Sequence, residues 1–337
     1  VQIDRVLNGP TNEMWIDPWV EYLVGQGVSM HLRTAVKSFN LTNGRIESVS
    51  VDVDGDEREV VADHFISGLP VEKMETFLTP EMKAESKSLS EIHNLHVEWM
   101  NGIQFYLDHD VPVVHGHTIY VDSAWALTSV SQHQFWKGVD LAEFGDGRVR
   151  GILSIDISDW KTNGTEVHLK PADECTAEEV VEETWAQLLA HLNEGGRQQL
   201  SDANRLAWHL DPDIVFPRTE HVEDNNKEPL LINKAGSLQY RPEAGTEIPN
   251  LYLASDYVHT TTDLACMEGA NEAARRAVNA LLDRVGSDAK RCELWPWDVP
   301  WFLRVLQKHD KKKWEKGHPQ HDDFDNLPEG IFDGEGP

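Results

Sequence analysis

The chain has 337 residues, of which 40% are hydrophobic, and it carries a formal net charge of −28 at pH 7. This length and apolar content are enough for one large or two medium domains with a buried core. The acidity argues against binding to nucleic acid, for which a basic footprint is expected, and against contact with an anionic membrane surface. Such an excess of negative charge is typical of a solubility adaptation, for example to a high-salt cytoplasm.

The cysteines and the first residues bear on compartment and processing. Cys175, Cys266 and Cys292 are odd in number and widely spaced, which excludes a disulfide framework and fits a reducing, cytoplasmic environment. No run of about 18 apolar residues predicts a membrane-spanning helix. Because VQIDRV contains neither an initiator Met nor a signal segment, we expect an upstream segment that was removed or that belongs to a longer protein.

Residues 1–72 predict one helix followed by β-structure. Apolar residues at helical spacing predict a helix over 15–24, with Trp15 and Trp19 in the core. Asn43-Gly44 is a strong hairpin signal between two strands. The last strand ends in Ser67-Gly68-Leu69-Pro70, whose small residues would let another backbone or a cofactor come close. The predicted strands are 28–32, 35–41, 46–53, 60–62 and 64–69.

The middle of the chain predicts short helices, several strands and one long amphipathic helix. Residues 71–92 have a helical pattern in pieces broken by Pro80, and strands follow within 93–157. Residues 176–193 predict a helix that Thr176 caps and whose apolar face turns inward.

The most informative stretch begins with a short apolar strand at 250–254, which ends in Ser255 and Asp256. After a polar loop, a helix is predicted over 266–282. The unpaired amides of a first helical turn point out of the helix, and the helix dipole favours negative charge there. The strand, acid, loop and helix therefore predict a site for a polar ligand at a helix N-terminus.

Other site motifs fail. Gly145-Asp146-Gly147 followed by Gly151 has the wrong spacing for a dinucleotide fingerprint, and no phosphate-binding P-loop or H-E-x-x-H occurs. His115 and His117 would share one face of a strand, but the sequence offers no third ligand beside them. We therefore predict no metal site.

The stretch at 250–282 resembles the C-terminal flavin-binding motif of the FAD-dependent amine oxidase and phytoene desaturase superfamily. The matching residues run from Asn250 to Asp256 and from Met267 to Ala270, and the strand that closes in Ser67-Gly68-Leu69-Pro70 and Arg241-Pro242 also match. Together the matches cover about a quarter of the chain. The sequence is most similar to the branch that includes carotenoid desaturases and hydroxysqualene dehydroxylases.

This resemblance implies an α/β fold of mixed α+β type. It implies an incomplete FAD-binding Rossmann-like domain with an inserted substrate domain made of a β-sheet plus helices. The FAD-binding domain would comprise residues 28–72 and 245–285, and the substrate domain would comprise residues 1–27 and 73–244. Separately from the resemblance, the composition of residues 286–337 predicts a Trp-rich segment docked on the body and then a polar tail.

The resemblance also implies roles at matching positions. Asp256 would bond the ribityl or pyrophosphate region of FAD, with Ser255 in place of the glycine usual before the acid. Val36 would contact adenine through its backbone, and Gly68 would lie beside FAD. Four residues of the helix start would face the flavin N1–C2=O edge through their amides: Met267, Glu268, Gly269 and Ala270.

We expect an FAD-dependent oxidoreductase of the desaturase or dehydrogenase type, which transfers hydride at an apolar, isoprenoid-type substrate. No titratable side chain stands out as an obligatory base. The alternative is a flavin amine oxidase, for which Lys234 and either Tyr240 or Tyr257 would be the catalytic candidates. A further alternative is a non-catalytic partner subunit of a flavoprotein complex.

One departure from the family is large. The N-terminal βαβ unit with G-x-G-x-x-G, which holds the diphosphate and the adenosine ribose, is absent from the sequence. We therefore expect a hetero-oligomer in which a second chain or a cleaved segment supplies that unit. The other expected partner is a small apolar substrate, taken up with peripheral membrane contact.

Overall fold

A computed structural model describes residues 6–196, 198–216, 225–295 and 300–317. The polar tail predicted for the last twenty residues lies outside this range. Helices and several separate sheets make up the described residues, which confirms the mixed α/β class. The Rossmann-like character of the FAD-binding domain and the domain boundaries stay predictions. None of the described helices is long and apolar enough to cross a bilayer.

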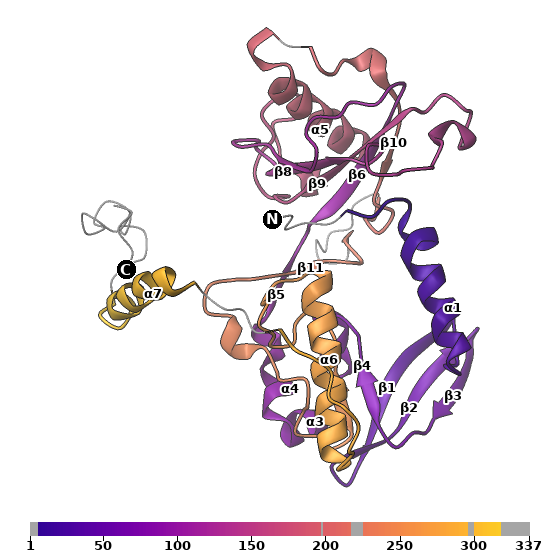
Figure 1. Cartoon of the computed structure of the whole chain (residues 1–337), viewed down its shortest axis with the longest axis vertical. Coiled ribbons are helices and arrows are strands. Elements are labelled where there is room, and N and C mark those ends of the chain that lie inside the picture. The colour runs from indigo at the N-terminus through magenta and orange to yellow at the C-terminus, as the bar shows by residue number, and fades with distance from the viewer. Residues whose placement is uncertain (1–5, 197, 217–224, 296–299, 318–337) are drawn as a thin grey trace.

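Two hydrophobic cores divide the molecule into an upper unit, residues 99–216, and a lower unit, residues 34–98 and 225–295 (Figure 1). The upper unit contains a five-stranded antiparallel sheet in the order β10-β6-β9-β8-β7 and the helix α5. Its elements are β6 (Asn101–Leu107), β7 (His117–Ile119), β8 (Leu127–Ser131), β9 (Gly151–Ile157), α5 (Ala177–Leu192) and β10 (Arg205–Leu210).

Strand alternation fixes which face of this sheet meets α5. Along β6, Ile103, Phe105 and Leu107 are buried, whereas Gln104 and Tyr106 point to the opposite face and are only half-buried. The Phe105 ring lies 4.8 Å from that of Trp185 on α5. α5 begins at Thr176 with a complete capping box, as its sequence predicts.

Among the described residues, the lower unit holds two sheets that contribute to its core, the short β5–β11 pair described below, and the α-helices α2, α3, α4 and α6. β1, β2 and β3 form an antiparallel sheet, and β4 pairs in parallel with β12. The elements are β1 (Thr34–Thr42), β2 (Arg45–Val53), β3 (Asp56–Val60), β4 (Phe65–Ser67), α2 (Val71–Phe77), α3 (Pro80–Glu85), α4 (Lys87–Glu91), β12 (Leu251–Leu253) and α6 (Met267–Arg284).

Two local predictions for this unit are confirmed by its turns and helix starts. Asn43 and Gly44 both have positive φ, 52° and 73°, between the paired residues Thr42 and Arg45, as a tight hairpin of this kind requires. Pro80 occupies the first turn of α3, where its missing N–H costs no hydrogen bond.

The segment before β1 corrects two predictions. Residues 28–32 form no strand, since no neighbouring strand among the described residues pairs with them. The helix at 15–24 exists as a π-helical turn, η1 (Asn12–Ile16), and α1 (Asp17–Gly25), but neither buries a residue. Trp15 is 39% exposed and Trp19 is 55% exposed, so their predicted place in the core is wrong for the described structure.

A narrow connection joins the two units. β5 (His96–Glu98) pairs antiparallel with β11 (Leu230–Ile232) just before the chain enters β6. At this junction the buried amide of Asn226 donates to Asn101 Oδ1 over 2.8 Å, and the Asn101 amide donates to Asp211 Oδ2 over 2.8 Å. These paired groups satisfy one another away from water, which favours a defined orientation of the units.

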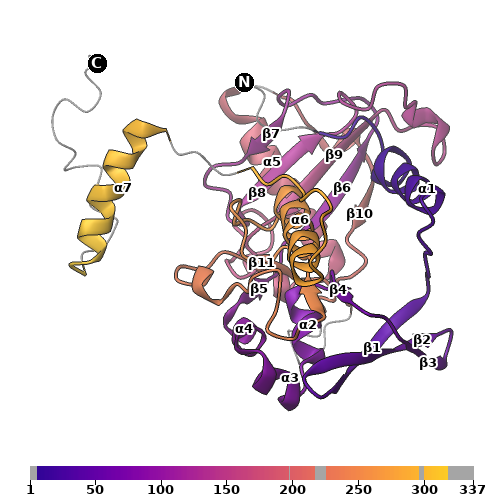
Figure 2. The same cartoon turned by 60° about the horizontal axis from the view of Figure 1, so that its bottom comes forward.

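The C-terminal segment only partly follows its prediction. Asn279 bonds the backbone of Cys292 twice, and the guanidinium of Arg275 lies 4.6 Å from the Trp295 ring, so residues 292–295 dock along α6. The next helix, α7 (Trp301–Trp314), stands away from both units in two views (Figures 1 and 2). Trp297 lies outside the described residues, so docking of the whole Trp-rich segment stays a prediction.

Candidate functional site

The carboxyl ends of β4 and β12 meet at one edge, because the two strands run parallel. The Ala254 amide donates to the Ser67 carbonyl over 2.8 Å, which places Gly68 next to Ser255. A side chain at Gly68 would touch only the Ala254 carbonyl, at 4.0 Å from an added Cβ. This edge is open on the side of Gly68, and ligands of α/β proteins bind at such strand ends.

The first turn of α6 offers hydrogen-bond donors at the end of the loop that follows β12. The Cys266 thiol accepts from the Gly269 amide over 3.4 Å. The amides of Met267 and Glu268 have no acceptor among the described residues. An added Cβ at Gly269 would lie 2.6 Å from the Leu264 carbonyl, so glycine is needed for the loop to close onto the helix. These donors favour a ligand that carries negative charge or a carbonyl oxygen.

Arg241 organises the loop between β12 and α6. Its side chain is 1% exposed, and its Nε lies 3.1 Å from Asp263 Oδ1. One terminal nitrogen donates to the Asp256 carbonyl over 2.8 Å, and the other donates to the Asn233 side chain. Three backbone segments are thus tied to one cation.

Glu272 fixes the same loop from the helix side. Its carboxylate accepts from the Thr261 amide over 2.9 Å and pairs with Arg276 at 2.7 Å. Burial pushes the pKa of Glu272 upward, but the Thr261 and Arg276 bonds outweigh it, so the carboxyl keeps a pKa below its usual range. It therefore stays ionised and holds the loop at neutral pH.

Carboxyl and hydroxyl side chains lie close to one another where β12 ends. Asp256 accepts from the Ser255 hydroxyl over 3.3 Å, and none of the described cations pairs with its carboxylate. Tyr257 is fully buried, and its hydroxyl has no partner among the described residues. Burial raises the pKa of Tyr257, and the carboxylates of Asp256 and Glu72 raise it further. Burial also raises the pKa of Glu72, with Glu228 and Asp256 acting in the same direction.

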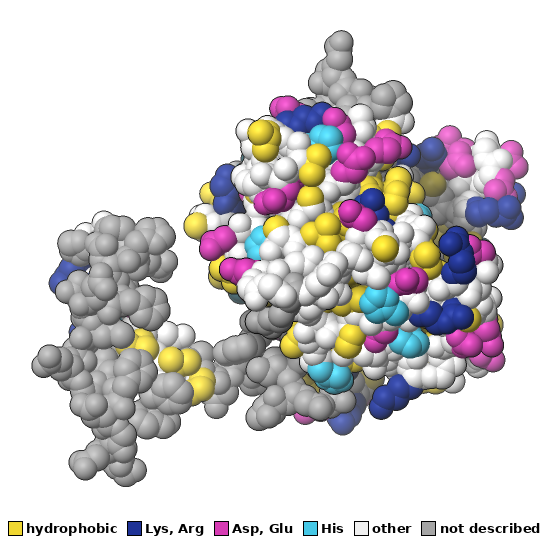
Figure 3. All heavy atoms as spheres, turned by 90° about the horizontal axis from the view of Figure 1, so that it is seen from above, with side chains coloured by type: hydrophobic (Ala, Val, Ile, Leu, Met, Phe, Trp, Pro, Cys, Tyr) yellow, Lys and Arg dark blue, Asp and Glu magenta, His cyan; other side chains and the backbone are white. Residues whose placement is uncertain are grey.

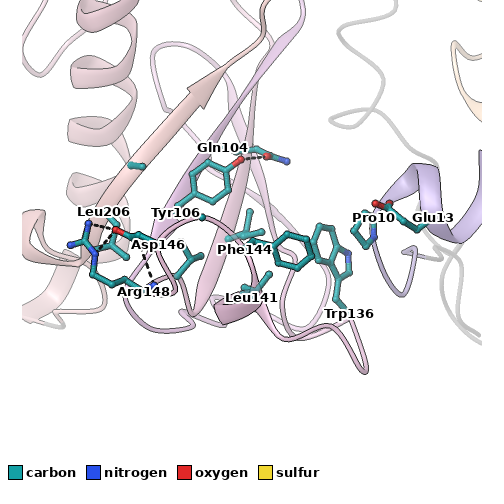
Figure 4. A pocket seen from close by; sticks show the side chains of 14 residues that line it. Pro10, Glu13, Gln104, Tyr106, Trp136, Leu141, Phe144, Asp146, Arg148 and Leu206 are labelled. Carbon is teal, nitrogen blue, oxygen red and sulfur yellow. Dashed lines mark hydrogen bonds and ion pairs between the residues drawn. The ribbon is translucent and has the colours of Figure 1, made fainter.

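A cavity of about 660 Å³ lies on the face of the upper sheet that points away from α5 (Figure 4). Tyr106, Ile152 and Leu206 form its floor, and the walls come from two separate segments. Leu141, Phe144 and Trp136 stand on one side, and Pro10 and Glu13 approach from the N-terminal segment.

Polar groups in this cavity are few and mostly paired with one another. The Tyr106 hydroxyl donates to Gln104 Oε1 over 3.1 Å, and Arg148 pairs with Asp146 at 2.6 Å. Glu13 adds a carboxylate, and the other lining side chains are aromatic or aliphatic. Such a site suits an apolar ligand with few hydrogen-bonding groups.

Comparison with known proteins decides the family. The family model described as flavin-containing amine oxidoreductase matches residues 16–282, which is most of the chain. The chain belongs to this family. The match spans both units, so the flavin-containing amine oxidoreductase family accounts for the upper sheet as well as for β4, β12 and α6.

Two known proteins are similar to this chain over most of its length. It is 24% identical to a 15-cis-phytoene desaturase of Synechococcus elongatus over 283 residues, which cover 82% of this chain and 52% of the relative. It is 16% identical to an oxidoreductase of known crystal structure from Methanosarcina mazei, with a TM-score of 0.47, covering 80% of this chain and 54% of that one. The chain thus spans about half the length of these two proteins.

The structure brings together most residues that the sequence predicts for the cofactor. Gly68, Ser255 and Asp256 lie at one strand edge, and the four residues from Met267 begin the helix that follows it. Val36 lies apart on β1, paired with Val51 and packed on the lower core. No finding tests the contacts of these residues with a flavin, so their roles stay predictions.

The three catalytic candidates differ in their exposure to solvent. Lys234 is exposed in the loop after β11, Tyr240 packs partly on the lower core, and Tyr257 is fully buried inside it. Sequence reasoning missed Glu72 and the cavity around Tyr106. The closeness of Glu72 to the turn at Gly68 is a signal that could have marked it, whereas nothing local marks the cavity.

Proposed function

We propose that this protein belongs to an FAD-dependent oxidoreductase of the desaturase or dehydrogenase type. The observation that carries the proposal is the strand edge at Gly68 and Asp256, followed by the helix that starts at Met267. It offers an open approach, a carboxylate that pairs with none of the described cations, and amides that lack an acceptor among the described residues. Membership of the flavin-containing family supports FAD as the ligand.

Each group has a role suited to its chemistry. The Asp256 carboxylate would accept hydrogen bonds from cofactor hydroxyls, and the amides of Met267 and Glu268 would donate to the flavin carbonyl edge. Gly68 would allow close approach of the cofactor to the backbone. Bound FAD supplies the hydride acceptor, and the protein orients the substrate and excludes water.

The cavity on the upper sheet supports an apolar substrate. The cavity of about 660 Å³ has a mostly aromatic and aliphatic lining, and its polar groups include the Tyr106–Gln104 and Arg148–Asp146 pairs. It fits a hydrocarbon chain of isoprenoid type. The relative named a 15-cis-phytoene desaturase makes such a substrate the first to test.

The open edge of β4 supports a second segment that carries the nucleotide half of the cofactor site. Phe65 and Ser67 make their backbone bonds to the β12 side, so the Ile66 amide and carbonyl face the other edge. No described strand pairs there, and Ile66 is 48% exposed. Parallel strands are normally covered and extended by neighbours. The exposed apolar side chains of α1 add surface for the same partner.

The cofactor is tested by releasing it from the native protein and measuring its mass and absorbance. We expect FAD in the wild type and at least about tenfold weaker retention in Asp256→Ala, because that variant loses the acceptor for cofactor hydroxyls. Glu243→Ala, an exposed acid near the same loop, is the matched control and should retain FAD. Absence of any flavin from the wild-type assembly would refute the proposal.

The second segment is tested by native mass spectrometry of the protein purified from its source. We expect this chain in complex with a polypeptide that carries G-x-G-x-x-G. Ile66→Pro removes one edge donor without touching the β12 side, and it should dissociate the complex. A yellow, FAD-loaded sample that contains this chain alone would contradict the need for a partner.

A further inference from the structure

The sheet face that forms the cavity floor continues along β9 toward the lower unit. Ile152 lies in that floor, and Ser154 and Asp156 follow it on the same face, because side chains alternate along a strand. Asp156 is therefore about 14 Å from Ile152 along the strand. It pairs with Gly102 at the start of β6, where the chain enters the upper unit from the lower one (Figure 1). Asp156 thus lies between the cavity and the junction of the two units.

The carboxylate of Asp156 is half-buried and has few polar partners. Its one hydrogen bond among the described residues comes from the Ser158 hydroxyl, over 3.5 Å, and no described cation forms an ion pair with it. The paired positions on the neighbouring strands, Gly102 and Thr128, carry no charge. Because Gly102 has no side chain, β6 does not cover the carboxylate on this face. The contacts within the described structure therefore leave the Asp156 oxygens largely unused.

Burial makes Asp156 a stronger base than an exposed aspartate. It raises the pKa of this carboxyl above the ordinary value of 3.8, and the Ser158 bond and the exposed imidazole of His117 on β7 oppose the rise without cancelling it. Among the described residues, His117 is the titratable group that acts on Asp156. A general base works best when its pKa is close to the working pH. The pKa of Asp156 is therefore shifted in the direction that suits a proton acceptor.

The other carboxylates around the cavity are less suited to accept a proton. Asp146 pairs with Arg148 at 2.6 Å, and the hydrogen bonds from Arg148 lower the pKa of Asp146. Glu13 is exposed to water. On the face seen in Figure 3, acidic side chains are likewise dispersed over the surface among cations. Asp156 differs because it is half-buried and pairs with no described cation.

We propose that Asp156 is the catalytic base and accepts a proton from the apolar substrate. The proposal rests on the proposed function, in which bound FAD accepts a hydride. Two adjacent carbons of the substrate each lose one hydrogen, one as a hydride to the flavin and the other as a proton to Asp156. A C=C bond forms, the flavin gains two electrons, and the carboxylate becomes a carboxylic acid. Because Asp156 is only half-buried, it can then return the proton to water.

The test is anaerobic stopped-flow absorbance of the FAD-loaded native protein, with any partner that it carries, mixed with a detergent-dispersed isoprenoid hydrocarbon, phytoene. Asp156→Asn should slow flavin reduction at least about 100-fold, as the loss of a general base does, with FAD content and melting temperature unchanged. Asp122→Asn is the control. It changes an exposed acid in the same unit, at a positive φ of 66° that asparagine tolerates, and should keep the wild-type rate.

The pH profile and chemical rescue separate catalysis from structure. The wild-type rate should rise with pH as the Asp156 carboxyl ionises, and this rise should be absent in Asp156→Asn. Added formate should raise the rate of Asp156→Ala at least about tenfold, because it replaces the missing carboxylate. Independently of flavin, infrared difference spectra of the wild type against Asp156→Asn should show a carboxyl group that ionises above pH 3.8.

The outcomes distinguish this proposal from the proposed function. Wild-type flavin reduction in Asp156→Asn would overturn the proposal for Asp156 alone. Slow reduction accompanied by lost FAD or a lowered melting temperature, with no rescue by formate, would assign Asp156 a structural role and also overturn it. A wild-type protein that holds FAD but shows no flavin reduction would overturn the proposed function, and the role of Asp156 with it.

Discussion

Arg241 and Asp263 form an ion pair with Nε and Oδ1 3.1 Å apart, although one partner precedes β12 and the other follows it. Asp263 has a positive φ of 44°, an unusual backbone conformation for a residue with a side chain. The Asn233 amide donates to its carbonyl, and the buried Arg241 side chain holds its carboxylate. The pair therefore fixes the conformation of the loop that connects β12 to the start of α6.

Replacing Arg241 by Met should loosen this loop. The substitution keeps the bulk of the side chain but leaves the Asp256 carbonyl and the Asn233 side chain without their donor, so we expect a loss of about 2–4 kcal/mol. Urea unfolding measures it. Arg58→Met is the control, since Arg58 is exposed on β3, and its change should stay within about 0.5 kcal/mol. Equal effects of both substitutions would argue against a role for the pair.

Gly68→Val should separate cofactor binding from folding. The backbone at Gly68 has no positive φ, and an added Cβ meets only one carbonyl at 4.0 Å, so the protein should fold with an unchanged melting temperature. The valine methyls would occupy the space needed for close approach, and FAD retention should fall at least about tenfold. Gly25→Val, also in open space, is the matched control. Full FAD retention in Gly68→Val would place the cofactor elsewhere.

Glu183 should make stability depend on pH. It is fully buried, and its oxygens accept from four successive amides, Thr165 to His168, at 2.6–3.0 Å. Burial pushes the pKa of Glu183 upward, but these hydrogen bonds outweigh it and bring the pKa below its ordinary value of 4.5. A lowered folded-state pKa means that this stabilisation is present above pH 4.5 and is lost as the pH falls through the folded-state value.

Glu183→Gln should therefore cost about 2–4 kcal/mol at pH 7, because an amide nitrogen would face backbone donors. The difference from the wild type should shrink below pH 4.5. Chemical denaturation at about pH 7 and about pH 4 measures both values. Glu182→Gln, a neighbouring exposed acid that pairs with His168, should cost under about 1 kcal/mol. A difference for Glu183→Gln that stays constant with pH would contradict this account.

Filling the cavity should affect substrate use without affecting the cofactor. Leu206→Trp would place an indole in the space above Tyr106 and Ile152, and we expect KM for an apolar substrate to rise at least about tenfold with FAD content unchanged. Steady-state kinetics on detergent-dispersed substrate measures it. Leu169→Trp, at a position 70% exposed, is the control. Unchanged KM in Leu206→Trp would mean that the substrate binds outside this cavity.

Local signals in the sequence predicted the elements that carry their own determinants. Asn43-Gly44 specified a hairpin, and Thr176 with Glu179 specified the start of α5, because turn geometry and capping depend on a few adjacent residues. The strand ending at Leu253 and the helix beginning at Met267 were also predicted within a residue or two. The last two of these elements, β12 and α6, are part of the candidate cofactor site.

Predictions that depended on distant partners were less successful. Trp15 and Trp19 have the spacing of a buried face, but burial needs a neighbour, and none of the described elements covers them. The cavity unites segments around residues 10, 106, 144 and 206, so no window of sequence could show it. The role of Arg241 likewise depends on three partners brought together by tertiary structure.

The buried side chain of Asn250 connects the two ends of the lower unit. Its amide oxygen accepts from the Ile46 amide over 2.9 Å, and its nitrogen donates to the Ile46 carbonyl over 2.8 Å, although 204 residues separate them. Closing so long a loop is slow and costs entropy before any contact forms. During synthesis the upper unit, which is continuous in sequence, can fold on the ribosome first. The strand edge proposed for the cofactor can be completed only after Asn250 has emerged, so a cofactor that binds there would load after the upper unit has been synthesised.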